Sequence, residues 1–215
     1  MKITKKAMTA IIREIVARHT DNLPLSGEDR ETILKVLKNH PLWNSKVGVG
    51  LADVVVRTNR RPGCAVTRGF HIIRSDGSST DISWVEALSP TPHPRKVKLA
   101  FRDLVTDQIL AFRDSHPWQG QPFNCPVTGE VTPWSDSHVD HEPPDTFDRL
   151  VELFFANEPV PIEKVPLKEH SDGDLVDQLA DAALAERWQN FHAERARLRI
   201  ISSKGNLSLG RVNRP

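Results

Sequence analysis

The sequence predicts an α+β fold in two parts, because the period of its apolar residues changes twice along the chain. Before residue 40, apolar residues recur every three or four positions, as on one face of a helix. Between residues 46 and 88 they follow the alternate spacing of strands, and helical spacing returns after the proline-rich segment 89–94. We therefore expect N-terminal helices and a small antiparallel sheet in residues 1–90, followed by a second domain in residues 95–215.

Two helices are expected to open the first part. The first carries apolar residues at helical spacing, namely Met8, Ile11, Ile12, Ile15 and Val16. The second begins after Ser26, which suits an N-cap, and ends before Pro41, since proline disfavours the helical conformation in the residue that precedes it. Strands are then expected at 53–57, 69–74 and 80–84, and the Asp76-Gly77 turn between the last two predicts a hairpin.

Length and composition exclude little. The 215 residues are enough for one large domain or two small ones. The absence of an apolar run of about 18 residues argues against a membrane span. Cys64 and Cys125, the two cysteines, make no disulfide framework and favour the cytoplasm.

Charge is informative only in its distribution, because the net charge is +1. Acidic residues dominate 142–186, and basic residues dominate 187–214. A local basic patch can bind phosphates even when the total charge is near zero, since salt screens fields beyond about 10 Å. The alternative is a solvated, salt-bridged surface.

Three segments of the strand-rich block carry a resemblance to a known family. They are Val47–Gly50, Gly69–Ser78 and Asp81–Trp84. Together they resemble the domain named for the plant "defective chloroplasts and leaves" (DCL) proteins. Such domains occur in proteins tied to ribosomal RNA processing and to plant RNA polymerase tails, so the resemblance implies contact with nucleic acid. It supplies no catalytic residue.

A second set of motifs follows the amphipathic helix expected across 97–112. The turn Cys125-Pro126-Val127-Thr128-Gly129, the strand Val139-Asp140-His141 with Pro143, and the segment 197–206 occur in that order. This order resembles the HNH, or ββα-metal, nucleases. Their motif opens with Cys-x-x-Cys-Gly, continues with a strand ending in Val-Asp-His, and closes with Asn-Leu-Gln-x-Leu-Cys-x-x-Cys-Asn. The resemblance implies a ββα-metal module with added helices.

The same resemblance implies the roles of individual residues. Catalytic roles fall to His141, Arg197 and His192, metal-binding roles to Asp140 and Asn206, and nucleic-acid contacts to His138, Arg195, Arg199, Lys204 and Arg211. Arg197 stands where the family has the asparagine that orients the histidine, so His192 or Asn190 is expected to orient it instead. Cys125 alone remains of the four family cysteines, and we therefore expect no structural zinc.

Phosphodiester hydrolysis requires these residue types. A neutral histidine can take a proton from water at neutral pH. Mg²⁺ or Mn²⁺, held by the oxygen atoms of Asp140 and Asn206, would neutralise the charge that develops on the phosphate. Adjacent strand residues point to opposite sides, so the strand must end at His141 for both side chains to reach one phosphate.

The resulting hypothesis is a metal-dependent endonuclease of the cytoplasm, acting on DNA rather than RNA by family analogy. Some relatives cut both strands as dimers, which leaves a homodimer open. One alternative is a non-catalytic nucleic-acid-binding protein with a degenerate HNH module. Another is a zinc-binding adaptor that uses Cys125, His138 and His141.

Overall fold

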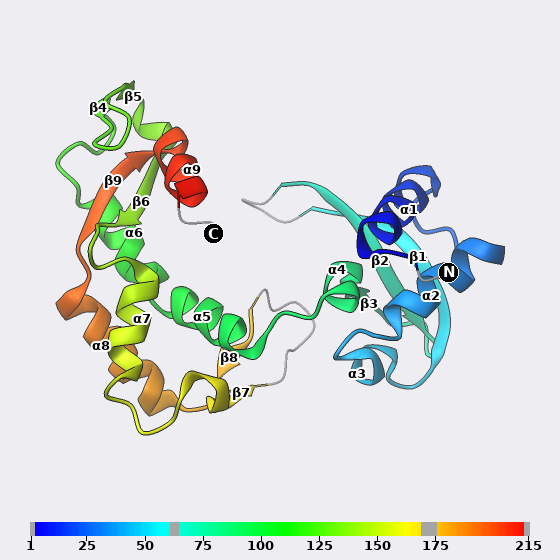
Figure 1. Ribbon diagram of the computed structural model, residues 1–215. Helices are drawn as coiled ribbons and strands as arrows, with labels where there is room; N and C mark the ends of the chain where they lie inside the picture. The colour runs from blue at the N-terminus through cyan, green and yellow to red at the C-terminus, as the bar shows by residue number, and fades with distance from the viewer. Residues whose placement is uncertain (1–2, 61–64, 169–175, 213–215) are drawn as a thin grey trace. The chain divides into compact units, whose positions relative to one another are not determined.

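The computed structural model describes residues 3–60, 65–168 and 176–212. Helices and small antiparallel sheets make up these ranges, so the protein is α+β, as the sequence predicts (Figure 1). The chain divides into two compact units between Pro92 and His93, inside the proline-rich segment. Within the described ranges, every helix is too short or too polar to cross a bilayer.

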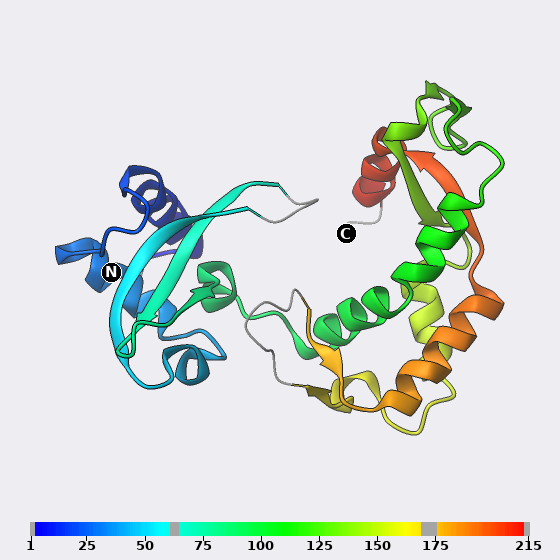
Figure 2. The same cartoon turned by 180° about the vertical axis from the view of Figure 1, so that it is seen from behind.

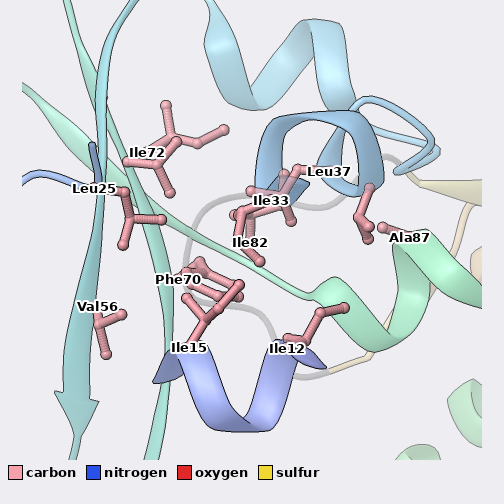
Figure 3. Close-up of a cluster of buried hydrophobic side chains, with 12 residues drawn as sticks. Ile12, Ile15, Leu25, Ile33, Leu37, Val56, Phe70, Ile72, Ile82 and Ala87 are labelled. Carbon is pink, nitrogen blue, oxygen red and sulfur yellow. The ribbon is translucent and has the colours of Figure 1, made fainter. Parts of the chain in front are cut away.

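Unit 1 is a three-stranded antiparallel sheet packed against helices. Strands β1 (Leu51–Asn59), β2 (Thr67–Arg74) and β3 (Ser79–Ile82) follow one another across the sheet, and α1 (Lys5–Arg18) and α2 (Gly27–Leu37) pack on it. The buried side chains between sheet and helices are aliphatic apart from Phe70; they include Ile12, Ile15, Ile33, Leu37, Val56, Ile72 and Ile82 (Figure 3). Each such burial stabilises the fold by about 1.5–3 kcal/mol.

The expected third strand is too long by two residues. Strand β3 ends at Ile82, and the Ser83 hydroxyl accepts a hydrogen bond of 3.2 Å from the backbone N–H of Glu86. This N-cap starts α4 (Trp84–Leu88), so Trp84 is helical. A second short helix, α3 (Trp43–Val47), was also not expected from the sequence.

Unit 2 has a helical core around one tryptophan. The helices that contribute to it are α5 (His93–Leu104), α6 (Thr106–Asp114), α7 (Phe147–Phe155) and α8 (Ala182–Arg195) (Figure 2). Trp188 of α8 is fully buried, and its ring stacks on Phe101 with centroids 4.7 Å apart. Phe147 and Phe154 of α7 meet the same indole edge-on, which fixes α7 and α8 against α5.

The single helix expected across 97–112 is interrupted at Val105. This residue has φ −104° and ψ 5°, outside the helical range, and it separates α5 from α6. The carbonyl of Leu104 instead accepts a hydrogen bond of 2.8 Å from the side chain of Gln189 in α8. The tertiary bond therefore takes the place of a helical one.

A two-stranded ribbon followed by a helix completes unit 2. Strand β6 (Ser137–His141) pairs antiparallel with β9 (Leu198–Ser202), and α9 (Ser203–Val212) follows β9 directly (Figure 1). The smaller elements are the hairpin β4 (Phe123–Asn124) and β5 (Val131–Thr132), the pair β7 (Leu167–Lys168) and β8 (Gln178–Leu179), and the 3-10 helices η1 (Trp134–Asp136) and η2 (Ile162–Lys164).

Candidate active site

Strand β6 distributes the predicted site residues over its two faces, because successive side chains alternate. His138 lies on the face toward α9, and its Nε2 is 2.8 Å from the hydroxyl of Ser203, the first residue of that helix. Asp140 shares this face by parity. His141, the last residue of the strand, points the other way, toward α7 and α8.

Asp140 forms a cross-strand ion pair with Arg199, its register partner on β9. Both Nε and Nη2 of Arg199 donate to Oδ2 of Asp140, at 2.9 and 2.7 Å. Charge-assisted bonds of this kind are stronger than neutral ones, particularly where the partners are partly buried, as here. None of the described residues donates a hydrogen bond to the other oxygen, Oδ1.

His141 is held on two sides. Its Nε2 lies 2.9 Å from Nε2 of His192, and the ring of Phe147 meets it edge-on with centroids 5.5 Å apart. Burial lowers the pKa of His141 below its ordinary value, and the charge of Arg102 lowers it further, while Asp140 opposes both. His141 is therefore neutral at neutral pH.

His192 links His141 to the helical core. It is 1% exposed, and its Nδ1 lies 2.7 Å from Oε1 of Gln108 on α6. Burial, and then the neighbouring His141, lower the pKa of His192 to about 4. Asn190, the other residue that the sequence suggested for orienting His141, is exposed on α8.

Sequence reasoning missed Arg102. Its guanidinium lies over the ring of Phe147, 4.3 Å from the centroid, and its charge acts on His141. Arg102 is exposed, and it forms no ion pair with any of the described residues. No pattern distinguishes it from the other charged residues of α5, so only the fold reveals its place beside His141.

The predicted residues of α9 lie on the side of the ribbon that carries Asp140. Asn206 is exposed, and no hydrogen bond joins it to Asp140 within the described residues. Lys204 is also exposed and forms an ion pair with Glu130. Arg211 belongs to α9, but its side chain lies outside the described part of the structure.

The remaining basic residues of the prediction lie between α8 and β9. Arg197 is exposed, and its main-chain carbonyl accepts a hydrogen bond of 2.8 Å from the N–H of Glu142, which extends the strand pairing by one residue. Arg195 is exposed at the end of α8, and its guanidinium lies 5.8 Å from the ring centroid of Phe191. Neither residue forms a hydrogen bond or an ion pair with His141 or Asp140 in the part of the chain that the structure describes.

The four positions that carry cysteine in the resembled motif come together at the other end of the ribbon. The Cys125 sulfur accepts hydrogen bonds from the N–H and the hydroxyl of Ser202, at 3.3 and 3.2 Å. Gly205 packs so closely that a Cβ there would lie 3.0 Å from this sulfur. Burial opposes ionisation of the thiol, but hydrogen bonds from Ser202 and Thr128 outweigh it and lower the pKa of Cys125 to about 6.

The three residues of the zinc-adaptor alternative are not brought together. Cys125 bonds with Ser202, His138 with Ser203, and His141 with His192. Across the ranges that the structure describes, no three His, Cys, Asp or Glu side chains gather as metal ligands.

The residues on the α9 side do fit a hard divalent cation by donor type. Mg²⁺ is commonly held by one or two carboxylates together with waters and substrate phosphates. Oδ1 of Asp140 and the amide oxygen of Asn206 are donors of this kind. Arg199 stays on Oδ2 and neutralises part of the carboxylate charge, which weakens the site for a cation.

Comparisons with known proteins concern a different part of the chain. Residues 13–88 match the model of a family described as "Protein of unknown function (DUF3223)". Among solved structures, a solution NMR structure of an uncharacterized protein from Rhodospirillum rubrum is 27% identical over 39% of this chain and 77% of that chain, with a TM-score of 0.34. No curated protein matches. The family match ends before unit 2 begins.

Proposed function

We propose that this protein is a metal-dependent, HNH-type endonuclease that hydrolyses phosphodiester bonds of nucleic acid. The supporting observation is the β6–β9–α9 arrangement, which places Asp140 and Asn206 on one side of a ribbon and a neutral His141 at the strand end. Because β6 ends at His141, a phosphate can approach both sides only at that end of the ribbon.

Each side chain then has a defined task. His141 accepts a proton from the attacking water, which a neutral imidazole can do at neutral pH. His192 holds the ring in place, and Arg102 presents an exposed cation that can meet the anionic oxygens of the phosphate. Asp140 and Asn206 would hold a divalent cation, which neutralises charge in the transition state and stabilises the departing oxygen.

Family analogy favours DNA over RNA as the substrate. The resemblance of unit 1 to DCL domains supports a nucleic-acid partner of either kind. Arg195 and Lys204 are exposed cations that can contribute backbone contacts, whose strength falls with salt.

The decisive test is cleavage of plasmid, single-stranded DNA and RNA in the presence of Mg²⁺ or Mn²⁺. Replacing a general base should slow the reaction by roughly 10²–10⁴-fold in His141→Ala. His116→Ala is the matched control, since this ring lies among Phe112, Trp118 and Trp134, outside the site. Equal cleavage by wild type and His141→Ala would reveal a contaminating nuclease and reject the proposal.

One observation favours the non-catalytic alternative, in which the module only binds nucleic acid. The Arg199 guanidinium already pairs with Oδ2 of the Asp140 carboxylate that would hold a cation. Salt-dependent binding without cleavage of any substrate would establish this alternative.

A further inference from the structure

We infer that Gln108 is a positioning residue: acting through His192, it holds His141 with its proton on Nε2 and with Nδ1 as the nitrogen that accepts a proton. As a role in catalysis, this inference rests on the proposed nuclease function. As a statement about proton positions, it follows from hydrogen-bond geometry and can be tested without any substrate.

The first step is the orientation of the Gln108 amide. Its Nε2 donates to the main-chain carbonyl of Gln189 at 2.9 Å. A main-chain carbonyl can only accept, so the NH₂ group must face it and the orientation of the amide is determined. The opposite side of the amide is then Oε1, which lies 2.7 Å from Nδ1 of His192.

The second step is the tautomer of His192. The amide oxygen of Gln108 can only accept, so Nδ1 of His192 must carry hydrogen. His192 is 1% exposed, and burial disfavours the doubly protonated, charged ring. The remaining nitrogen, Nε2, therefore has a lone pair and no hydrogen.

The third step determines the tautomer of His141. The two Nε2 atoms are 2.9 Å apart, a distance at which one hydrogen lies between them. Because His192 cannot supply that hydrogen, His141 does. A neutral His141 with hydrogen on Nε2 has its lone pair on Nδ1, and no described residue donates to that atom.

The helices supply this chain of contacts from three directions. Gln108 lies on α6 and His192 on α8, while Phe147 of α7 fixes the plane of the His141 ring. His192 follows Trp188 by four positions, so the residue that anchors the core also sets the height of His192 along α8. The base is thereby oriented by the packed interior of unit 2.

The direct experiment is long-range ¹H–¹⁵N NMR of the full chain labelled with ¹⁵N-histidine, which separates protonated from unprotonated ring nitrogens. We expect hydrogen on Nε2 of His141 and on Nδ1 of His192 in the wild type at neutral pH. Hydrogen on Nδ1 of His141 would overturn the inference.

Two variants identify the source of these proton positions. Gln108→Leu removes the acceptor and should give mixed tautomers at both histidines. Gln189→Leu is the matched control, since it removes a partly buried glutamine hydrogen bond to the Leu104 carbonyl from the same helix interface. An unchanged tautomer pattern in Gln108→Leu would reject the role of Gln108.

Cleavage assays then distinguish this inference from the proposed function. Partners that orient a metal-ligating histidine typically contribute about 10- to 100-fold, and we expect a loss of that size in Gln108→Leu and none in Gln189→Leu. A wild type with the expected tautomers but without cleavage would reject the nuclease and leave the proton positions established. Full activity in a Gln108→Leu protein with mixed tautomers would reject the catalytic importance of Gln108.

Discussion

The two ends of the β6–β9 ribbon are supported by different chemistry. At the Ser137–Ser202 end, a cluster of Cys125, Ser202 and Gly205 is held by bonds to sulfur and by close packing. At the His141–Leu198 end, one histidine is held by another through nitrogen atoms, and a carboxylate is held by Arg199.

The difference concerns how much each end depends on particular atoms. The first end only has to hold strands and turn together, and small side chains can do this by filling space and sharing hydrogen bonds. The second end presents a single lone pair and a single carboxylate oxygen, which no packing can replace. Three of four cysteine positions can therefore differ from the resembled motif while Asp140, His141 and Asn206 match it.

Acid should destabilise the His141–Leu198 end of the ribbon, the histidine end, more than the Ser137–Ser202 end, the cysteine end. This loss is the largest effect on stability that we expect. The folded-state pKa of His192 is about 4, below its ordinary value, so the unfolded chain binds more protons as the pH falls. Its contribution is complete above about pH 6.5 and is lost as the pH falls toward 4, at a total cost of up to about 3 kcal/mol. Chemical denaturation of the wild type and His192→Gln at several pH values measures this difference.

His141 is the titratable group that faces His192, so both rings must be considered in that comparison. His116→Gln keeps the pair intact and should retain the wild-type pH dependence. Parallel stability curves for the wild type and His192→Gln would contradict the prediction.

A larger residue in place of Gly205 should destabilise the cysteine end selectively. A Cβ at this position would lie 3.0 Å from the Cys125 sulfur, so Gly205→Val must push the first turn of α9 away from β9. Overpacking of this kind typically costs about 1–3 kcal/mol. Thermal unfolding would measure the loss, with Leu207→Val, at a 69% exposed position of the same helix, as the control. Equal stability of the two variants would show that the cluster is loosely packed.

Removing the ion-pair partner of Asp140 should strengthen cation binding at the histidine end. Arg199→Gln removes the cation that shares this carboxylate, so Mn²⁺ should bind more tightly, by about tenfold for a charge removed at this range. Isothermal titration calorimetry with Mn²⁺ compares this variant with Arg197→Gln, which removes an equal charge from an exposed position without a contact to Asp140. Unchanged Mn²⁺ affinity would argue against Asp140 as a ligand.

Local signals in the sequence predicted the elements better than their interruptions. Apolar spacing was sufficient for α1, α2 and the first two strands, because each buries one regular face. The break at Val105 was not predictable, since it depends on Gln189, a residue 85 positions from Leu104. The cap by Ser83 was visible in principle, as a serine three residues before Glu86.

The same distinction applies to the candidate site. The Asp-His step and Asn206 could be found from motif order, and strand alternation predicts that Asp140 and His141 point to opposite sides. The partners of these residues could not be found. No local signal marks Gln108 or Arg102 among the polar residues of their helices. The pairing of Asp140 with Arg199 follows from strand register alone.

The ribbon also sets the order in which the molecule can assemble. Asp140 and Arg199 are 59 positions apart, and closing a loop of that length costs roughly 4 kcal/mol of chain entropy. A pair of five-residue strands recovers little of this alone, so we expect α7 and α8 to pack around Trp188 first and to bring β6 and β9 together. A molecule with only its helices formed would already be compact, yet it would lack the strand pair that presents His141. For the proposed nuclease, the histidine would therefore be presented only after folding is complete.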